Sequence, residues 1–381
     1  MDPLDKLRQH RESLAEVESR VARLRAEFAA GDQSTKLRLL APAHDRRRFQ
    51  NYDPTAPVLS EADARLVIAN QEGYAFWSKY ESYLHLDPAV QAVIVAVRTG
   101  DLPALTSLLR DEPAAANPSW IDGFPPMLPI PNDSIPLFCA SEGVFRGTNR
   151  SGNEYELTHA LIAAGALPDI EGGLPLASAV SFGAVRVVDA LLDGGAAVDG
   201  VDRDGVPMSY AVHFGWREIA ELLYRRGASL DLRFAAGLGR LNLVKSWFNP
   251  DGSLKPGAGA FSDPYGLERK MCGGSMHRCD RTRANILDQS FYFACANVHL
   301  EIAEFLLEQG AKINAIVPGL DSHATVLHLI ATRDPGYLPV IQFLLDHGAN
   351  RAVRDEEYFA TPADWARHAK REEALELLSA A

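Results

Sequence analysis

Apolar residues along most of this chain fall into pairs of short runs with helical spacing, and a glycine separates the two runs of each pair. Gly183 and Gly215, which divide two such pairs, are 32 residues apart, and the same offset joins Gly195 to Gly227. This repetition predicts helix–turn–helix units that stack, because such a unit buries its apolar face only against a neighbour.

The residues within one unit explain its expected geometry. The dividing glycine ends the first helix in a turn where a positive φ carries no side-chain penalty. Apolar residues at three- and four-residue spacing, such as Val187 to Leu192, form the buried stripe of the second helix. A turn-forming segment, here 202–205, then leads to the next unit.

The same template assigns about eight units to the last three quarters of the chain. They lie at 92–109, 136–166, 175–196, 207–228, 234–247, 286–314, 325–350 and 361–378, and the last is a truncated cap.

The units resemble the ankyrin repeat, whose consensus reads T-P-L-H-x-A-A-x-x-G-x-x-x-x-V-x-x-L-L-x-x-G-A. Matching stretches are Thr325 to Ala331 and Thr361 to Ala366. The resemblance implies an all-α ankyrin-repeat solenoid with short β-hairpin tips over residues 88–381, and a protein partner bound on its concave face. Residues 63–77 are similar to a helical lead-in found before ankyrin repeats in many bacterial proteins, which suggests a bacterial source.

Residues 1–87 are expected to form an N-terminal helical extension. Leu14, Val17, Val21, Leu24 and Phe28 share one helix face. This face either docks onto the first repeats or makes a short coiled-coil dimer. Within the array, insertions interrupt the repeats near 115–135, 141–157 and 249–285.

Charge and composition exclude several classes of function. The net charge of -12 argues against binding to nucleic acid or to an anionic membrane. No secretory signal opens the sequence, and no apolar stretch is long enough to span a bilayer. Four cysteines are too few for a disulfide framework in 381 residues, so we expect a cytoplasmic protein with reduced thiols.

Two insertions carry unusual residues. The segment from Trp120 to Pro131, which includes Phe124, is apolar and rich in proline, so it either covers the core or contacts a partner. Cys272, His277 and Cys279 match none of the common zinc spacings, and we expect no metal and no cofactor.

Catalysis is the alternative to partner binding. The common nucleotide-binding and hydrolase motifs are absent from the sequence. A reaction, or a small-molecule site, would have to be built in the groove from His213, Asp288, Tyr292 and His328.

Binding residues are expected on the hairpin tips and first helices, where large side chains with few torsions dominate interface energies. The candidates are Arg203, Asp204, Tyr210, His213, Trp216, Tyr292, Tyr358 and Phe359, with Trp120 and Phe124 in the apolar loop. Trp216 directly follows Gly215, and it either packs on the neighbouring turn or contacts the partner.

Overall fold

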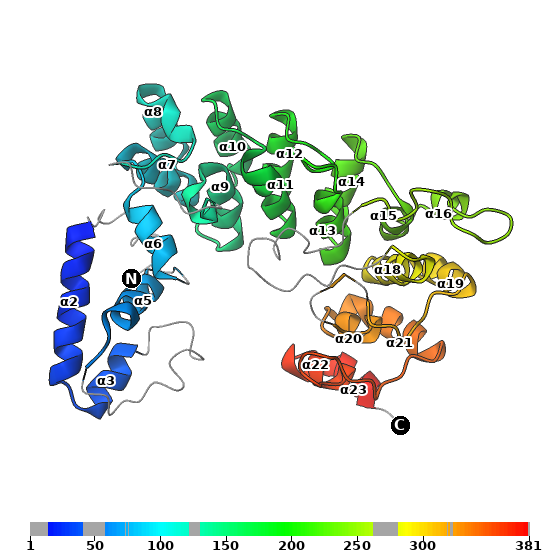
Figure 1. The fold of residues 1–381 in the computed structure, drawn as a ribbon. Coiled ribbons are helices and arrows are strands. Elements are labelled where there is room, and N and C mark those ends of the chain that lie inside the picture. The colour runs from blue at the N-terminus through cyan, green and yellow to red at the C-terminus, as the bar shows by residue number, and fades with distance from the viewer. Residues whose placement is uncertain are drawn as a thin grey trace. The chain divides into compact units, whose positions relative to one another are not determined.

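The computed structural model describes residues 14–40, 58–72, 74, 76–121, 130–261, 281–317, 319–320 and 323–379. The chain divides into two compact units, residues 1–171 and 172–381 (Figure 1), and each is described by itself. The boundary expected between residues 87 and 88 falls inside the first unit and stays a prediction about repeat assignment.

The first unit begins with helices that have no repeat pattern. They are α2 (Leu14–Ala30), α3 (Gln33–Leu40), α5 (Glu61–Gln71) and α6 (Trp77–Leu84). Val17, Val21, Leu24 and Phe28 of α2 are buried in one cluster with Leu59 and the apolar residues of α5. The seam predicted from their spacing therefore packs onto α5 of the N-terminal segment and not onto the first repeats as expected, and the dimer alternative stays a prediction.

Two helix pairs complete the first unit. They are α7 (Pro88–Thr99) with α8 (Leu102–Asp111), and α9 (Pro136–Phe145) with α10 (Glu154–Ala163). The short 3-10 turns η1 (Pro113–Ala116) and η2 (Asn132–Ser134) lie between the pairs. Helix α9 continues to Phe145, so the connection inside the second pair is shorter than the insertion expected at 141–157.

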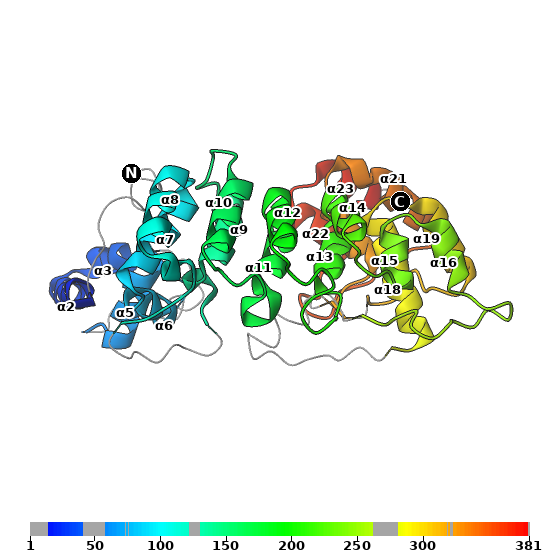
Figure 2. The same cartoon turned by 90° about the horizontal axis from the view of Figure 1, so that it is seen from above.

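Six further pairs occupy the rest of the described chain. They are α11 (Ile170–Ser181) with α12 (Val185–Asp193), α13 (Val206–Phe214) with α14 (Arg217–Arg225), α15 (Leu232–Gly237) with α16 (Leu241–Ser246), α18 (Arg283–Ala296) with α19 (Leu300–Glu308), α20 (Val326–Ala331) with α21 (Leu338–Asp346), and α22 (Pro362–His368) with α23 (Glu372–Ser379). Figure 2 shows α12 and α14 side by side, and these two second helices contact each other. The 3-10 turn η3 (Pro335–Tyr337) links α20 to α21.

The predicted all-α repeat fold is confirmed, with one difference at the tips. In the described residues, β structure is limited to isolated bridges between Leu86 and Trp120, Phe248 and Leu254, and Ile316 and Thr325. The expected β-hairpin strands are therefore not seen there. None of the described helices has the length and apolar character needed to cross a membrane.

At some tips, side chains join one repeat to the next through hydrogen bonds, most of them to the backbone. The Asp199 carboxylate accepts the N–H and hydroxyl of Ser229, 2.9 and 2.8 Å away. Asn314 accepts the N–H of Asn350 and donates to the carbonyl of Gly348. These bonds satisfy backbone groups that the extended connections leave open, so the tips are fixed although they contain no strands.

Helix α15 is only 6 residues long and lies between α13 and α18; we call it the wedge below. Its last residues, Ala235, Ala236 and Gly237, are buried and small. A Cβ at Gly237 would stand 2.7 Å from the side chain of Val212 in α13 and 3.5 Å from Phe293 in α18. Because α15 is short and ends in small residues, α18 contacts α13 as well as α15. The chain from α13 to α23 curves tightly (Figure 1).

We expect Gly237→Ala to lower the free energy of unfolding by about 1–3 kcal/mol, because the added methyl overlaps Val212 in a packed interior. Gly336→Ala is the matched control: it lies in an exposed turn with an ordinary φ, and its new methyl would meet only the Asp334 side chain. Urea melts of the two variants should separate clearly, and overlapping curves would contradict the wedge.

Candidate functional site

The tight curve brings His213 of α13 against Tyr292 of α18. The Tyr292 hydroxyl lies 3.0 Å from Nδ1 of His213, and both side chains are buried. Arg333, which follows α20, donates to the carbonyls of His213 and Phe214 at 2.6 and 2.9 Å. Asn297 donates to the carbonyl of Val212 at 2.8 Å. These side chains cap the C-terminal carbonyls of α13, which no helical N–H reaches.

Burial controls the protonation of this cluster. Desolvation, with Arg333 adding to it, lowers the pKa of His213 to about 3, so the imidazole is neutral at physiological pH. Desolvation also raises the pKa of Tyr292, against the opposing effect of Arg333, so the phenol stays protonated. A neutral imidazole and a neutral phenol can share a hydrogen bond without burying a net charge beside Arg333.

The other two catalytic candidates lie in separate environments. Asp288 accepts the backbone N–H of Lys312 at 2.7 Å. His328 contacts the Thr325 hydroxyl through Nδ1 and the Ala360 carbonyl through Nε2, which fixes the start of α20 and the following tip. Asp288 and His328 therefore each make separate structural contacts, while His213 and Tyr292 form one buried pair. The four side chains do not converge on a single site.

Three of the expected binding side chains do not reach the surface. Tyr210, His213 and Tyr292 are all buried, so the expectation that they line an open face is not met. For His213 and Tyr292 the reason is the direct contact between α13 and α18, which places the two side chains against each other. The sequence analysis assumed that each first helix is exposed on one side. The spacing of residues within one repeat does not indicate a contact between a repeat and the next but one.

Trp216 packs on the neighbouring turn and is also partly exposed. Its indole N–H donates to the carbonyl of Ser181 at 3.3 Å, and its ring lies where a Cβ at Gly183 would stand 3.0 Å from it. The same side chain is 41 % exposed. One ring face is thus packed on the neighbouring turn, and the rest of the ring is accessible.

The tip before α13 carries two further candidates. Arg203 is exposed and has a φ of +53°. Asp204 is half-buried and accepts the backbone N–H of Val206 at 3.1 Å, so its carboxylate helps to shape the turn.

The tip between α21 and α22 presents the most exposed pair of candidates. Tyr358 is 63 % exposed and Phe359 is 70 % exposed. The carboxylate of buried Asp355 accepts the N–H groups of Glu357, Tyr358 and Ala360, and also the indole N–H of Trp365. Burial raises the pKa of Asp355, but these donors outweigh burial and hold it below its usual range.

The apolar loop after the first helix pair is only partly described. Trp120 is half-buried, and its indole N–H donates to the carbonyl and hydroxyl of Ser82, each 3.2 Å away. This end of the loop packs on its own unit, as one of the two interpretations expected. Phe124 lies outside the described residues.

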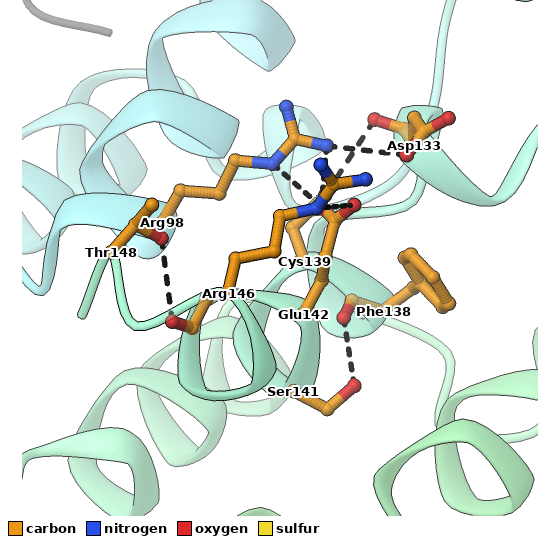
Figure 3. A network of polar contacts seen from close by, with 9 residues as sticks. Arg98, Asp133, Phe138, Cys139, Ser141, Glu142, Arg146 and Thr148 are labelled. Carbon is orange, nitrogen blue, oxygen red and sulfur yellow. Dashed lines mark hydrogen bonds and ion pairs between the residues drawn. The ribbon is translucent and has the colours of Figure 1, made fainter. Parts of the chain in front are cut away.

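A buried ionic network in the first unit was not predicted from the sequence. Arg98 of α7 donates to Glu142 of α9 at 2.8 Å and lies 3.5 Å from Asp133, and Arg146 also contacts Glu142 (Figure 3). Burial by itself would raise the pKa of Glu142. The positive charges of Arg98 and Arg146 outweigh this effect and hold the pKa below its usual range. Burial and the neighbouring Glu142 raise the pKa of Asp133. Each charge has an opposite partner, so the network serves as an internal tie between α7, α9 and η2.

A second buried charge lies within α15. Arg233 forms an ion pair of 2.8 Å with Asp231, donates to Gln289 of α18 at 2.7 Å, and bonds the carbonyl of Phe261. Burial of an arginine has no periodic signature in the sequence, and its partners come from distant segments. Only the pair of charges two residues apart could have suggested it.

No set of three or more His, Cys, Asp or Glu suited to a metal occurs in the part of the chain that the structure describes. Cys139 and Cys295 are buried free thiols, and desolvation raises the pKa of both. Such thiols are poor nucleophiles. Cys272, His277 and Cys279 lie outside the described residues.

Comparison with known families identifies one of these helix pairs. Residues 322–356, which contain α20 and α21, match the family model of the ankyrin repeat. The capping Thr325 and His328 described above lie in this ankyrin-type repeat. No curated protein matches the chain.

Solved ankyrin structures are also similar. The ankyrin repeat domain of human ASB11 is 21 % identical, with 77 % of this chain and 99 % of that chain covered and a TM-score of 0.35. The ankyrin repeat domain of Bcl-3 is 19 % identical, with coverages of 76 % and 98 % and a TM-score of 0.32. At such scores, neither structure carries any inference about partners of this chain.

The lowered pKa of His213 makes stability depend on pH. Below about pH 6.5 the unfolded chain protonates this histidine, whereas the folded chain keeps it neutral down to a pKa of about 3. The unfolded state thus binds more protons in this window, and stability falls as the pH falls. Between pH 7.5 and 5.0, we expect His213 to account for a loss of about 1–2 kcal/mol.

Urea melts of His213→Asn at both pH values measure this contribution, because asparagine can accept the Tyr292 hydrogen bond without titrating. The variant should lose less stability on acidification than the wild type. His347→Gln, at an exposed position, is the control and should behave as the wild type does. An equal loss in His213→Asn would show that the histidine is not held neutral.

Proposed function

We propose that this chain is a binding scaffold that recognises a protein partner through large side chains held on its turns and tips. One observation carries the proposal: Trp216, Tyr358 and Phe359 are 41, 63 and 70 % exposed while hydrogen bonds fix the backbone beneath them. Rigid aromatic side chains bury much area at little entropic cost, which is why they dominate interface energies.

The proposed binding residues lie at the two ends of the helices, on the turns and on the tips, rather than on the inner face. Between α13 and α20 the inner face is filled by Tyr292, Arg333 and Asn297, which bond to α13. A partner reaching this region from the concave side would meet groups that are already paired. The exposed residues of the turns and tips, Arg203 among them, are therefore the part of the predicted site that stays in the proposal.

Partner type follows from charge and from the repeat class. Ankyrin-type repeats commonly serve protein recognition, and a net charge of -12 disfavours nucleic acid. We propose no reaction for His213, Asp288, Tyr292 and His328, because their side chains are engaged in separate contacts. A cytoplasmic location and a bacterial source rest on the sequence alone and remain predictions.

We expect Trp216→Ala to weaken capture of the partner at least tenfold, which corresponds to about 1.4 kcal/mol or more. The partner is first isolated from a lysate of the source organism, identified by mass spectrometry and purified, and its affinity for each variant is then measured by calorimetry.

Tyr224→Ala supplies the matched control. Tyr224 is 42 % exposed, almost the same as Trp216, but it lies on the second helix α14 rather than on a turn or tip. Thermal melts of both variants accompany the titrations, because Trp216 also packs on Gly183. Equal losses of affinity in the two variants, or a loss that follows unfolding, would remove Trp216 from the proposed surface.

A further inference from the structure

The tip formed by residues 354–360, called the aromatic tip below, is a closed loop with a fixed backbone. The N–H of Asp355 donates to the carbonyl of Ala360, and the N–H of Ala360 returns to the Asp355 carboxylate, each at 2.9 Å. Arg354 donates to the carbonyl of Phe359 at 2.6 Å. The backbone conformation of the aromatic tip is therefore fixed before any partner binds, which lowers the entropic cost of binding.

Both ends of the aromatic tip are held by its neighbours. His328 of α20 contacts the carbonyl of Ala360 at 3.1 Å, and Trp365 of α22 donates to Asp355 at 3.0 Å. The N–H of Glu356 donates to the carbonyl of His323, which belongs to the preceding tip. The loop thus takes its rigidity from two adjacent repeats.

Phe359 is costly for folding at the position it occupies. Its φ is +53°, a left-handed conformation that side chains other than glycine disfavour. Among the described residues other than glycine with a positive φ, Phe359 and Val298 are the apolar ones. Phe359 is 70 % exposed, so little packing offsets the strain, and a glycine would fit this backbone better. Backbone strain of this kind concentrates at functional sites.

The aromatic tip is rich in acidic residues. The tip carries Asp355, Glu356 and Glu357 against the single cation Arg354, whose guanidinium is engaged with the backbone. The carboxylate of Glu356 lies 3.2 Å from Nδ1 of His323, yet the side chain is 66 % exposed, and Glu357 is also exposed. Aromatic faces beside carboxylates attract cationic groups through both cation–π and ionic contacts.

We propose that the aromatic tip is a preformed docking element for a peptide segment in which arginine or lysine stands beside an apolar residue. The cation would contact Glu356, Glu357 and the face of Tyr358, while the apolar residue would cover Phe359. The chain's charge of -12 favours the approach of such a segment and repels acidic peptides and nucleic acid. This inference rests on the proposed function and names the chemistry of its partner.

A random 12-residue peptide library displayed on phage and selected on the immobilised full chain tests the proposal. We expect enriched peptides to carry an excess of arginine or lysine with apolar neighbours. The most enriched peptide, made synthetically and labelled with fluorescein, then serves as the probe in anisotropy titrations against each variant.

Phe359→Gly separates binding from folding, because the two effects have opposite signs. The variant should lose at least tenfold in affinity for the labelled peptide while its melting temperature rises by about 2–4 °C as the strain is relieved. The double change Glu356→Gln and Glu357→Gln should weaken binding and flatten its dependence on salt.

Val298→Gly is the matched control. Val298 is the other apolar residue with a positive φ, is 42 % exposed, and lies on the turn between α18 and α19. This variant should also melt at a higher temperature, with peptide affinity unchanged.

Several results would overturn the inference: no enriched peptide, enriched peptides without basic residues, or affinity that Phe359→Gly leaves intact. If the peptide instead loses affinity in Trp216→Ala and not in Phe359→Gly, the aromatic tip is excluded while the proposed function stands. Failure of the proposed function itself would appear as partner capture that no turn or tip variant alters.

Discussion

The distance at which one first helix can approach the next constrains everything else in the second unit. A stacked repeat gains its core only by pressing its first helix against a neighbour, so small residues must stand at the points of closest approach. Gly237 at the end of α15 stands at such a point, because a Cβ there would lie 2.7 Å from Val212 of α13 and 3.5 Å from Phe293 of α18. The helices α13 and α18, on either side of α15, also contact each other.

The turns obey the same constraint. Gly183 leaves room for the ring of Trp216, and Gly239 leaves room for the ring of His299, which lies where a Cβ would stand 2.6 Å from it. The positive φ of each glycine ends a helix, and its missing side chain seats a ring from the next repeat. One residue type thus serves both the local turn and the stacking, which explains why the glycine period is the clearest signal in the sequence.

The sequence predicts local features well and distant contacts poorly. The apolar spacing of Leu191 and Leu223 and the regular glycines predict the helix pairs, because one repeat contains all the information needed for its own two helices. The contact between His213 and Tyr292 depends on how thin α15 is, and Arg333 reaches α13 from the seventh pair along the array. The spacing of residues within one repeat contains no information about either contact. For this reason, side chains that we expected on an open face are buried in the structure.

The same reasoning separates structural from functional residues among the exceptions. A buried group that departs from the repeat pattern, such as Arg233, is explained by its bonds to Asp231 and Gln289, and needs no partner outside the chain. Exposed Phe359 lacks comparable packing inside the chain. Phe359 adds strain and apolar surface without adding much packing, and the repeat would fold more easily with glycine in its place. Folding alone therefore does not account for Phe359, whereas the docking role proposed for the aromatic tip would account for it.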